Sequence, residues 1–198
     1  MSLIKRVMFF IDGENLVIRY QDMVKKGHKP LNGILHERDI YVWHSDIIKN
    51  QIRNILRVTY YTYATGAEEK LLDIKKQIQS IQYQFSGEKS GGGGRYSGPS
   101  QPRGMGNVIP CVFRKKQQSA KRKGVDIQMT IDMLNSSLME NVDALYLFSG
   151  DGDFVPLIRE VMRRGKQVYV MALSDGLNPE LQVTADGFGL LDSKIFQC

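Results

Sequence analysis

The chain has few cysteines and no long apolar run. Only two of its 198 residues are cysteine, Cys111 and Cys198, too few for a disulfide framework and without metal-ligand spacing. The apolar run from Val7 to Ile11 is too short for the core of a secretion signal, and no stretch reaches the length of a membrane span. These absences favour a reducing compartment, expected to be the cytoplasm, and argue against a membrane partner.

Acidic residues are nearly missing from one part of the chain. Between Gln84 and Gly124 there are nine basic residues and one acid, Glu88, a local charge of +8. The whole chain carries +6, which leaves −2 for the rest. Such a run can be an ordinary solvated surface, but concentrated basic charge also suits a nucleic-acid backbone. The candidate phosphate-binding residues are Arg114, Lys115, Lys116, Lys121, Arg122 and Lys123.

Strand-like apolar runs alternate with helical repeats along the chain, which predicts an α/β fold: a three-layer α/β/α sandwich with a mainly parallel central sheet. The expected strands are 4–12, 57–65, 108–113, 144–149 and 166–173, and the expected helices are 13–24, 39–56, 67–83, 125–139, 154–165 and 178–188. In the helix 125–139, the predicted inward face is Ile127, Ile131, Leu134 and Leu138. Residues 1–198 are expected to form one domain, with a flexible Gly/Ser-rich insertion at about 86–107.

Aspartates follow two of the predicted strands. Asp12 ends the first strand, Asp151 and Asp153 follow the strand 144–149, and Asp126 opens a helix. If the two strands are neighbours, these carboxylates converge at the carboxyl edge of the sheet, where α/β proteins bind ligands. Carboxylates held close together raise each other's pKa unless a cation compensates. Hard oxygen ligands favour Mg²⁺ or Mn²⁺, so the four aspartates are candidate metal ligands.

Each of these residues also has a structural alternative. Asp126 and Asp153 each precede a helical run and can be helix caps. Asn15, three residues after Asp12, can donate to a phosphate oxygen, accept from a metal-bound water, or cap the helix.

The motifs "FFIDGENL", "KGVDIQMTIDML", "LYLFSGDGDFVPLIREVMRRGKQVYVM" and "LNPELQVTADGFGLLD" together resemble the NYN family, the LabA-like branch of the PIN-like nucleases. The resemblance covers nearly the whole chain, apart from the Gly/Ser-rich stretch and residues 27–38. It implies a PIN-like fold and metal-dependent hydrolysis of RNA, single-stranded or structured, with a homo-oligomer left open. It also implies catalytic roles for Asp12, Asn15, Asp126, Asp151 and Asp153.

Two other functions fit parts of the pattern. A phosphatase resembling the haloacid dehalogenase superfamily would use Asp12 as nucleophile and Thr62 after the second strand, but Glu14 then stands where a second aspartate is usual. That alternative leaves Asn15 and Asp126 without roles. A non-catalytic RNA-binding or regulatory module would use the basic stretch alone.

Overall fold

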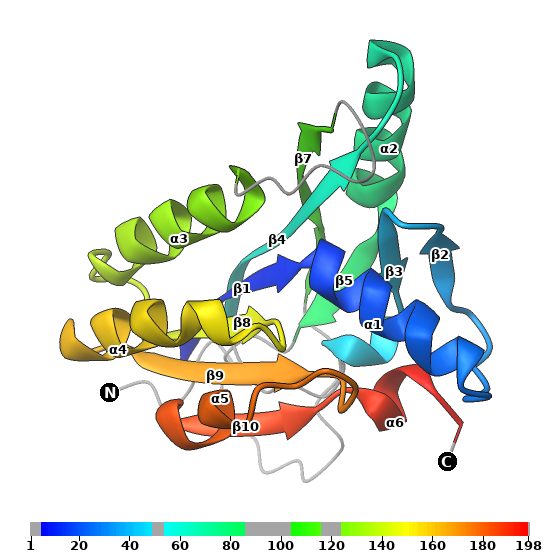
Figure 1. The fold of residues 1–198 in the computed structure, drawn as a ribbon. Coiled ribbons are helices and arrows are strands. Elements are labelled where there is room, and N and C mark those ends of the chain that lie inside the picture. Colours follow the sequence, from blue (N-terminus) through cyan, green and yellow to red (C-terminus); the bar gives the residue numbers. More distant parts are fainter. Residues whose placement is uncertain (1–4, 49–53, 86–103, 116–123, 198) are drawn as a thin grey trace, which may run out of the picture.

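The computed structural model describes residues 5–48, 54–85, 104–115 and 124–197. Its centre is a six-stranded sheet in which every neighbouring pair of strands is parallel (Figure 1). In spatial order the strands are β10 (Gly187–Leu190), β9 (Gln167–Ala172), β8 (Ala144–Phe148), β1 (Arg6–Asp12), β4 (Asn54–Ala64) and β7 (Ile109–Arg114).

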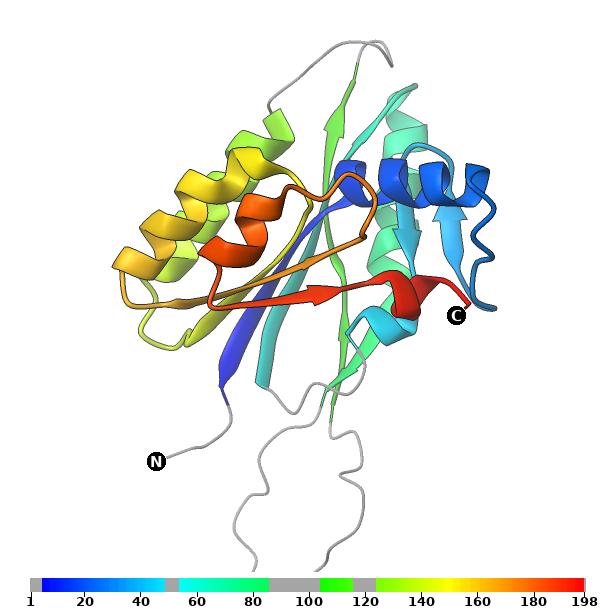
Figure 2. The same cartoon turned by 60° about the horizontal axis from the view of Figure 1, so that its bottom comes forward.

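Helices cover both faces of this sheet, which confirms the predicted three-layer α/β/α sandwich (Figure 2). One face carries α1 (Gly13–Lys25), α2 (Glu68–Ser80), α6 (Asp192–Ile195) and an antiparallel hairpin of β2 (Leu35–Glu37) and β3 (Tyr41–Trp43). The other face carries α3 (Gly124–Ser137), α4 (Val155–Arg163) and α5 (Pro179–Thr184). In the described residues, no helix is both long and apolar enough to cross a bilayer.

The apolar run of β1 is continuous because both of its faces are covered. Val7, Phe9 and Ile11 pack into the core under α1, whereas Met8 and Phe10 pack under α3 and α4. Alternate side chains of a strand point to opposite faces, so one short run contributes to two cores.

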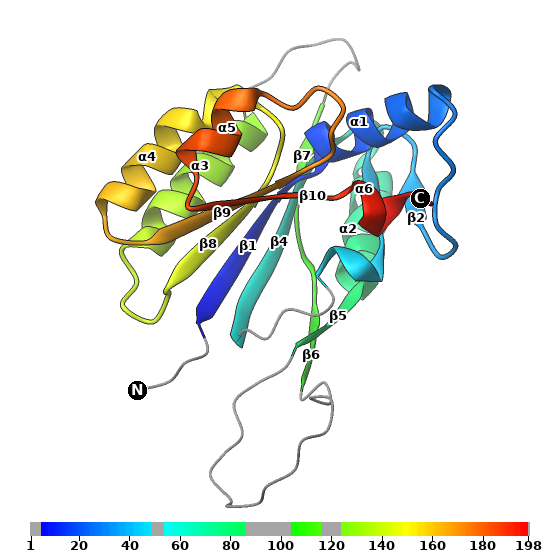
Figure 3. The same cartoon turned by 90° about the horizontal axis from the view of Figure 1, so that it is seen from below.

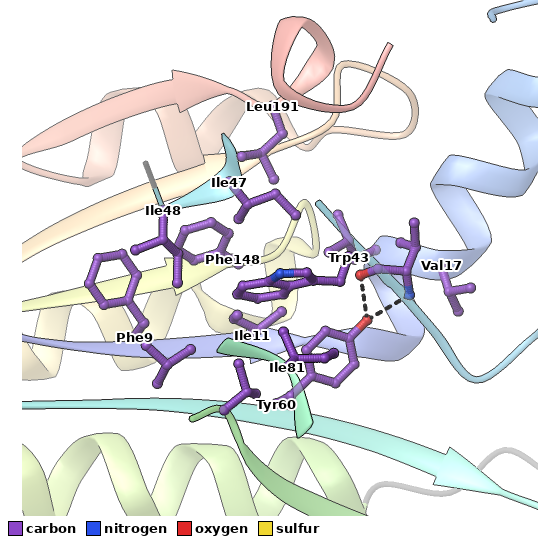
Figure 4. Packing of buried hydrophobic residues seen from close by; sticks show 14 of the residues in the cluster. Phe9, Ile11, Val17, Trp43, Ile47, Ile48, Tyr60, Ile81, Phe148 and Leu191 are labelled. Atoms are coloured by element: carbon purple, nitrogen blue, oxygen red, sulfur yellow. Dashed lines mark hydrogen bonds between the residues drawn. The ribbon is translucent and has the colours of Figure 1, made fainter. Parts of the chain in front are cut away.

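The core on the α1 face is rich in aromatic side chains (Figure 4). Phe9 of β1 stacks on Tyr146 of β8, with ring centroids 4.7 Å apart. Tyr60 of β4 is fully buried, and its hydroxyl donates to the carbonyl oxygen of Val42 at 3.2 Å and accepts from the Val42 N–H at 3.1 Å. Because a buried hydroxyl needs partners, this pair of hydrogen bonds fastens β3 to the sheet.

The order of the strands reverses between β1 and β8. From β1 the chain runs outward through β4 to β7, then returns to place β8 on the other side of β1 and runs outward again to β10 (Figure 3). A crevice for ligands is expected at the carboxyl ends of the strands at such a switch point. Asp12 ends β1 at this point, and Asp151 lies three residues after the end of β8.

The helix predicted over residues 39–56 is wrong. Residues 41–43 are strand β3, Ser45–Ile47 form one 3₁₀ turn, and β4 already begins at Asn54, with residues 49–53 outside the described part. The prediction rested on the helical spacing of five apolar residues: Trp43, Ile47, Ile48, Ile52 and Ile55. Ile52 lies outside the described residues, and the other four are buried from a strand, a single turn and β4. Tertiary packing has overridden a periodicity that was too short to decide.

The predicted inward face of α3 is also wrong. Ile127, Ile131 and Leu138 are 55%, 45% and 69% exposed. The helix instead buries a different apolar stripe, formed by Val125, Met129 and Met133. Leu134 is partly buried and packs against the same core. Both stripes are apolar at helical spacing, so the sequence pattern alone does not choose between them.

The end of the predicted flexible insertion is ordered. Residues 104–107 form strand β6 (Gly104–Asn107), which pairs antiparallel with β5 (Gln82–Phe85). The predicted helix 67–83 correspondingly ends at Ser80. The remainder of the insertion, 86–103, lies outside the described residues.

Candidate active site

Asp12 is buried at the carboxyl end of β1, with only 4% of its surface exposed. It is the N-cap of α1: its Oδ1 accepts from the Asn15 N–H at 3.1 Å, and its Oδ2 accepts from the Ser149 hydroxyl at 2.8 Å. Gly13 follows because α1 starts tightly against β4, where a Cβ would lie 2.2 Å from the Tyr60 ring. The Asp-Gly pair therefore reflects a helix that begins directly on top of the sheet.

The surroundings of Asp12 disfavour its charge. The pKa of Asp12 is raised to about 7, mainly by burial and to a smaller extent by the nearby carboxylates of Asp126 and Asp151. The hydrogen bonds from Asn15 and Ser149 act in the opposite direction, but both donors are neutral. The fold therefore brings Asp12, Asp126 and Asp151 close enough to repel one another, as the sequence predicts.

A chain of hydrogen bonds shapes the loop after β8. The Ser149 hydroxyl accepts from the Asp151 N–H at 3.1 Å, and Asp151 Oδ1 accepts from the Asp153 N–H at 3.0 Å. Asn15 Oδ1 accepts from the Gly150 N–H at 3.0 Å. Asn15 therefore joins α1 to this loop, a role that the sequence alternatives did not include.

The same loop is held from its other side by the segment before α5. The Asn178 N–H donates to the Gly150 carbonyl oxygen at 3.0 Å. A Cβ on Gly152 would lie 2.0 Å from Asn178 Nδ2, so only glycine fits there. Sequence reasoning missed Ser149 and Asn178 as positioning residues; their one signal was that both stand inside motifs that resemble the NYN pattern.

Asp126 stands in the first turn of α3, whose start is fixed by Tyr63 of β4. The buried Tyr63 hydroxyl accepts from the Val125 N–H at 2.9 Å. This hydrogen bond satisfies one of the free N–H groups at the start of the helix. The position of Asp126 is therefore set by a contact with β4.

A salt bridge borders the acid cluster. Lys115 Nζ lies 2.8 Å from Glu14 Oε1 and 5.3 Å from the centre of the Tyr63 ring. The Lys115 side chain is only 13% exposed, so this predicted RNA-binding residue has a partner within the protein. The two residues are 101 positions apart, and nothing in the sequence pairs them.

The remaining predicted residues are either exposed or outside the described part of the chain. Asp153 is exposed in the 3₁₀ turn Gly152–Phe154, and Arg114 is exposed at the end of β7. Four predicted RNA-binding residues lie outside the described part of the chain: Lys116, Lys121, Arg122 and Lys123.

The donor chemistry of the site suits a hard divalent cation, because carboxylate oxygens are the ligands that Mg²⁺ and Mn²⁺ prefer. The desolvated carboxylate of Asp12 and the carboxylates next to it would gain from a positive charge. Among the described residues, however, no group of three Asp, Glu, His or Cys side chains is already arranged to hold an ion.

The phosphatase alternative loses one of its residues. Thr62 is fully buried, and its hydroxyl donates to the carbonyl oxygen of Ile40. A hydroxyl enclosed in this way cannot contact a substrate phosphate.

The doubly wound sheet and the acidic edge at its switch point define a PIN-like α/β protein. The chain belongs to the NYN domain family, which matches residues 6–192, and NYN domains are part of the PIN-like nuclease superfamily. Members of this superfamily generally use divalent metals.

Two individual proteins are similar to this chain. A stretch of 62 residues is 36% identical to an uncharacterised protein of Methanocaldococcus jannaschii, covering 31% of this chain and 26% of that protein. The match thus spans about a quarter of that relative's length. The crystal structure of a protein of unknown function from Vibrio parahaemolyticus matches with a TM-score of 0.59 at 15% identity, over 100% of this chain and 99% of the other. That likeness shows the fold alone.

Proposed function

We propose that this protein is a metal-dependent ribonuclease whose active site is the acid cluster at the switch point. The observation that carries the proposal is the buried Asp12, held beside Asp126 and Asp151 without a cationic hydrogen-bond donor among its described partners. Such an arrangement is costly for the protein alone, and perturbed carboxylates gathered at a crevice are typical of functional sites. Membership of a family of PIN-like nucleases supports the same conclusion.

The residues of the chain divide the work between them. Asp12, Asp126, Asp151 and Asp153 would hold Mg²⁺ or Mn²⁺. Ser149 and Asn15 fix the positions of Asp12 and of the loop after β8, so that the carboxylates are arranged before substrate arrives. A bound metal ion would polarise the scissile phosphodiester and lower the pKa of an attacking water. In-line attack by water then leaves 5′-phosphate and 3′-hydroxyl ends.

The last part of the basic stretch, between Arg114 and Gly124, would hold the RNA backbone beside this site. It leaves the sheet at Arg114, the last residue of β7, and re-enters the described structure at Gly124, the first residue of α3. Both points lie at the carboxyl edge, where Asp126 follows two residues later. The proposed phosphate contacts are Arg114, Lys115, Lys116, Lys121, Arg122 and Lys123, with Lys115 shared between RNA and Glu14.

The ends of the products test the chemistry. End-labelled single-stranded and structured RNAs are incubated with the protein in Mn²⁺ and, in parallel, in EDTA. We expect cleavage only with Mn²⁺, and products that a 5′-phosphate-dependent exonuclease degrades. Products with 2′,3′-cyclic phosphate ends, or equal cleavage in EDTA, would show that the mechanism is wrong. RNA binding that survives EDTA and loss of Asp151, with no cleavage of any RNA, would favour the non-catalytic RNA-binding function.

A further inference from the structure

A cavity of ≈ 710 Å³ adjoins the acid cluster. Its walls come from the first turns of α1, the β2–β3 hairpin, the end of β4 and the first turn of α2, which lie together on one side of the sheet (Figure 1). Glu14 and Lys115 line the cavity, and Glu14 is two residues from Asp12. The volume is in the range of sites that enclose a small molecule. The cavity therefore reaches the Glu14–Lys115 salt bridge that borders the acid cluster.

The lining has a mixed character. Ile18 and Ile40 supply apolar surface, Arg38 and Lys70 supply positive charge, and Glu37 and Asp39 supply carboxylate acceptors. Lys70 is exposed and lies beside Gly66, where a Cβ would be 3.1 Å from the Lys70 Cδ. Its ammonium is available to a ligand, because among the described residues it forms no ion pair.

The carboxylate side of the cavity is fixed in place. Asp39 has a left-handed backbone with φ of 59°, and its Oδ1 accepts from Gln21 Nε2 of α1 at 3.0 Å. The Arg38 guanidinium lies 3.6 Å from the other Asp39 oxygen. Asp tolerates this backbone region better than most residues. The hairpin end thus presents a positioned acceptor and a cation together.

We propose that this cavity receives one unpaired nucleotide of an RNA strand, next to the phosphate that is cleaved. The proposal rests on the proposed function and names its substrate class as single-stranded RNA. The apolar wall suits a base, the cations suit its phosphate, and the carboxylates suit sugar hydroxyl and base amino donors. A base in a duplex is stacked and paired, so it cannot enter a concave site without leaving the helix.

The strand has a path beyond this cavity. A second cavity of ≈ 250 Å³ shares Arg38 and Asp39 with the first and continues along α1 to Tyr20 and His36. Consecutive nucleotides of an extended strand can occupy consecutive sites of this kind, with the exposed His36 ring available for base contact. The two cavities therefore define a path for the strand, from Lys115 past the turn of the β2–β3 hairpin and along α1.

Methyl NMR tests this placement without any need for cleavage. Protein with ¹³C-labelled isoleucine methyl groups is titrated in EDTA with a uridine tetranucleotide and, separately, with a blunt RNA duplex. We expect saturable shifts of Ile18 and Ile40 with the tetranucleotide, and none with the duplex at the same nucleotide concentration. Ile109, exposed at the amino end of β7, serves as the internal control and should not move.

A matched pair of lysine variants tests the phosphate contact. Lys70→Gln should weaken tetranucleotide binding and lower its salt slope by roughly 0.7, the value for one single-strand phosphate contact. Lys76→Gln, an exposed residue of the same helix outside the cavity, should change neither. Equal behaviour of the two variants would overturn the assignment of Lys70.

The outcomes separate this inference from the proposed function. Tetranucleotide binding that saturates while Ile18 and Ile40 stay unmoved would overturn the cavity assignment, even if the protein cleaves RNA. Shifts of both methyl groups in a protein that cleaves no RNA in Mn²⁺ would support the cavity as a nucleotide site and contradict the ribonuclease.

Discussion

The two ends of the neighbouring strands β1 and β8 treat charge in opposite ways. At the amino end, Arg6 and Asp143 satisfy each other: the Arg6 N–H and Nε donate to Asp143 Oδ2 at 2.7 and 3.0 Å, and Arg6 Nη2 lies 2.8 Å from Oδ1. At the carboxyl end, both donors that Asp12 has among the described residues are neutral, and two further carboxylates raise its pKa. The same pair of strands thus ends once in a neutral pair and once in an acid cluster.

The pKa values of the two aspartates record this difference. The Arg6 guanidinium lowers the pKa of Asp143 to about 2, whereas burial raises the pKa of Asp12 to about 7. The charge of Asp143 stabilises the fold, and the charge of Asp12 opposes it. A residue kept at a cost to stability points to function, so the comparison supports the proposed active site at the carboxyl end.

The largest expected effect is on the pH dependence of stability. The folded pKa of Asp12 is about 7 and its ordinary value is 3.8, so between these values the folded protein holds a proton that the unfolded chain has released. Without metal, the contribution of Asp12 to the free energy of unfolding should therefore be greatest below about pH 4 and fall by about 4 kcal/mol as the pH rises to 7.

Urea unfolding in EDTA across this pH range measures the effect. Asp12→Asn removes the titrating group and should remove most of the fall between pH 4 and 7. Asp73→Asn, an exposed change on α2, serves as the control and should keep it. A variant at Asp12 with the same pH profile as the wild type would mean that the acid cluster carries no such cost.

Metal binding should reverse that cost and is the next largest effect. At a Mn²⁺ concentration 100 times the Kd, stabilisation is about 2.7 kcal/mol, which corresponds to a rise in Tm of roughly 5 to 11 °C for a chain of this size. Asp151→Asn should show a much smaller rise, measured by thermal unfolding. An equal rise in Tm in the wild type and the variant would show that the metal does not bind at the carboxyl end.

The part of the basic stretch between Arg114 and Gly124 sharpens the comparison, because both of these residues lie at the carboxyl edge. Neutralising Lys116, Lys121 and Arg122 together should weaken RNA binding and lower its salt slope by about 2, from roughly 0.7 for each single-strand contact. Fluorescence anisotropy at several salt concentrations measures both quantities. Cleavage at saturating RNA should fall far less, and an unchanged slope would make the stretch a solvated linker.

The smallest effect is expected at the amino end. Asp143→Asn removes the charge that Arg6 contacts, but the pair is partly exposed, so Tm at pH 7 should fall by a few degrees at most. In the wild type this contribution is present above pH 3.8 and is lost as the pH falls toward 2. A fall in Tm larger than the change in Tm that Asp12→Asn causes would contradict the comparison.

Much of the fold could be predicted from the sequence, because strands and long amphipathic helices alternate with clear punctuation. The convergence of Asp12 and Asp151 required only that β1 and β8 be neighbours, and they are. The prediction of a helix over 39–56 was wrong because apolar residues at helical spacing fit a strand and a turn equally well. The face of α3 failed because Met129 and Met133 formed a second apolar stripe.

The site was less predictable in its details. The acidic residues of the candidate site could be named from the motifs. The burial of Asp12, however, depends on the packing of α1 against Tyr60. The pairing of Lys115 with Glu14 joins residues 101 positions apart, and no local pattern encodes it. Roles that arise from three-dimensional neighbours, such as those of Ser149 and Asn178, become visible only in the folded protein.

Cleavage by variants of the two ends tests the central claim most directly. Wild type, Asp12→Asn and Asp143→Asn are compared on one labelled RNA with Mn²⁺, at a temperature well below every Tm. We predict that Asp12→Asn lowers the rate by about a thousandfold, the order expected when a group that stabilises the transition state is lost. The cleavage rate of Asp143→Asn should stay within about threefold of the wild-type rate. This residue is distant from the proposed site, so its loss changes the stability of the fold and not the activation free energy of cleavage. Undiminished cleavage by Asp12→Asn, or an equal loss in both variants, would contradict the account.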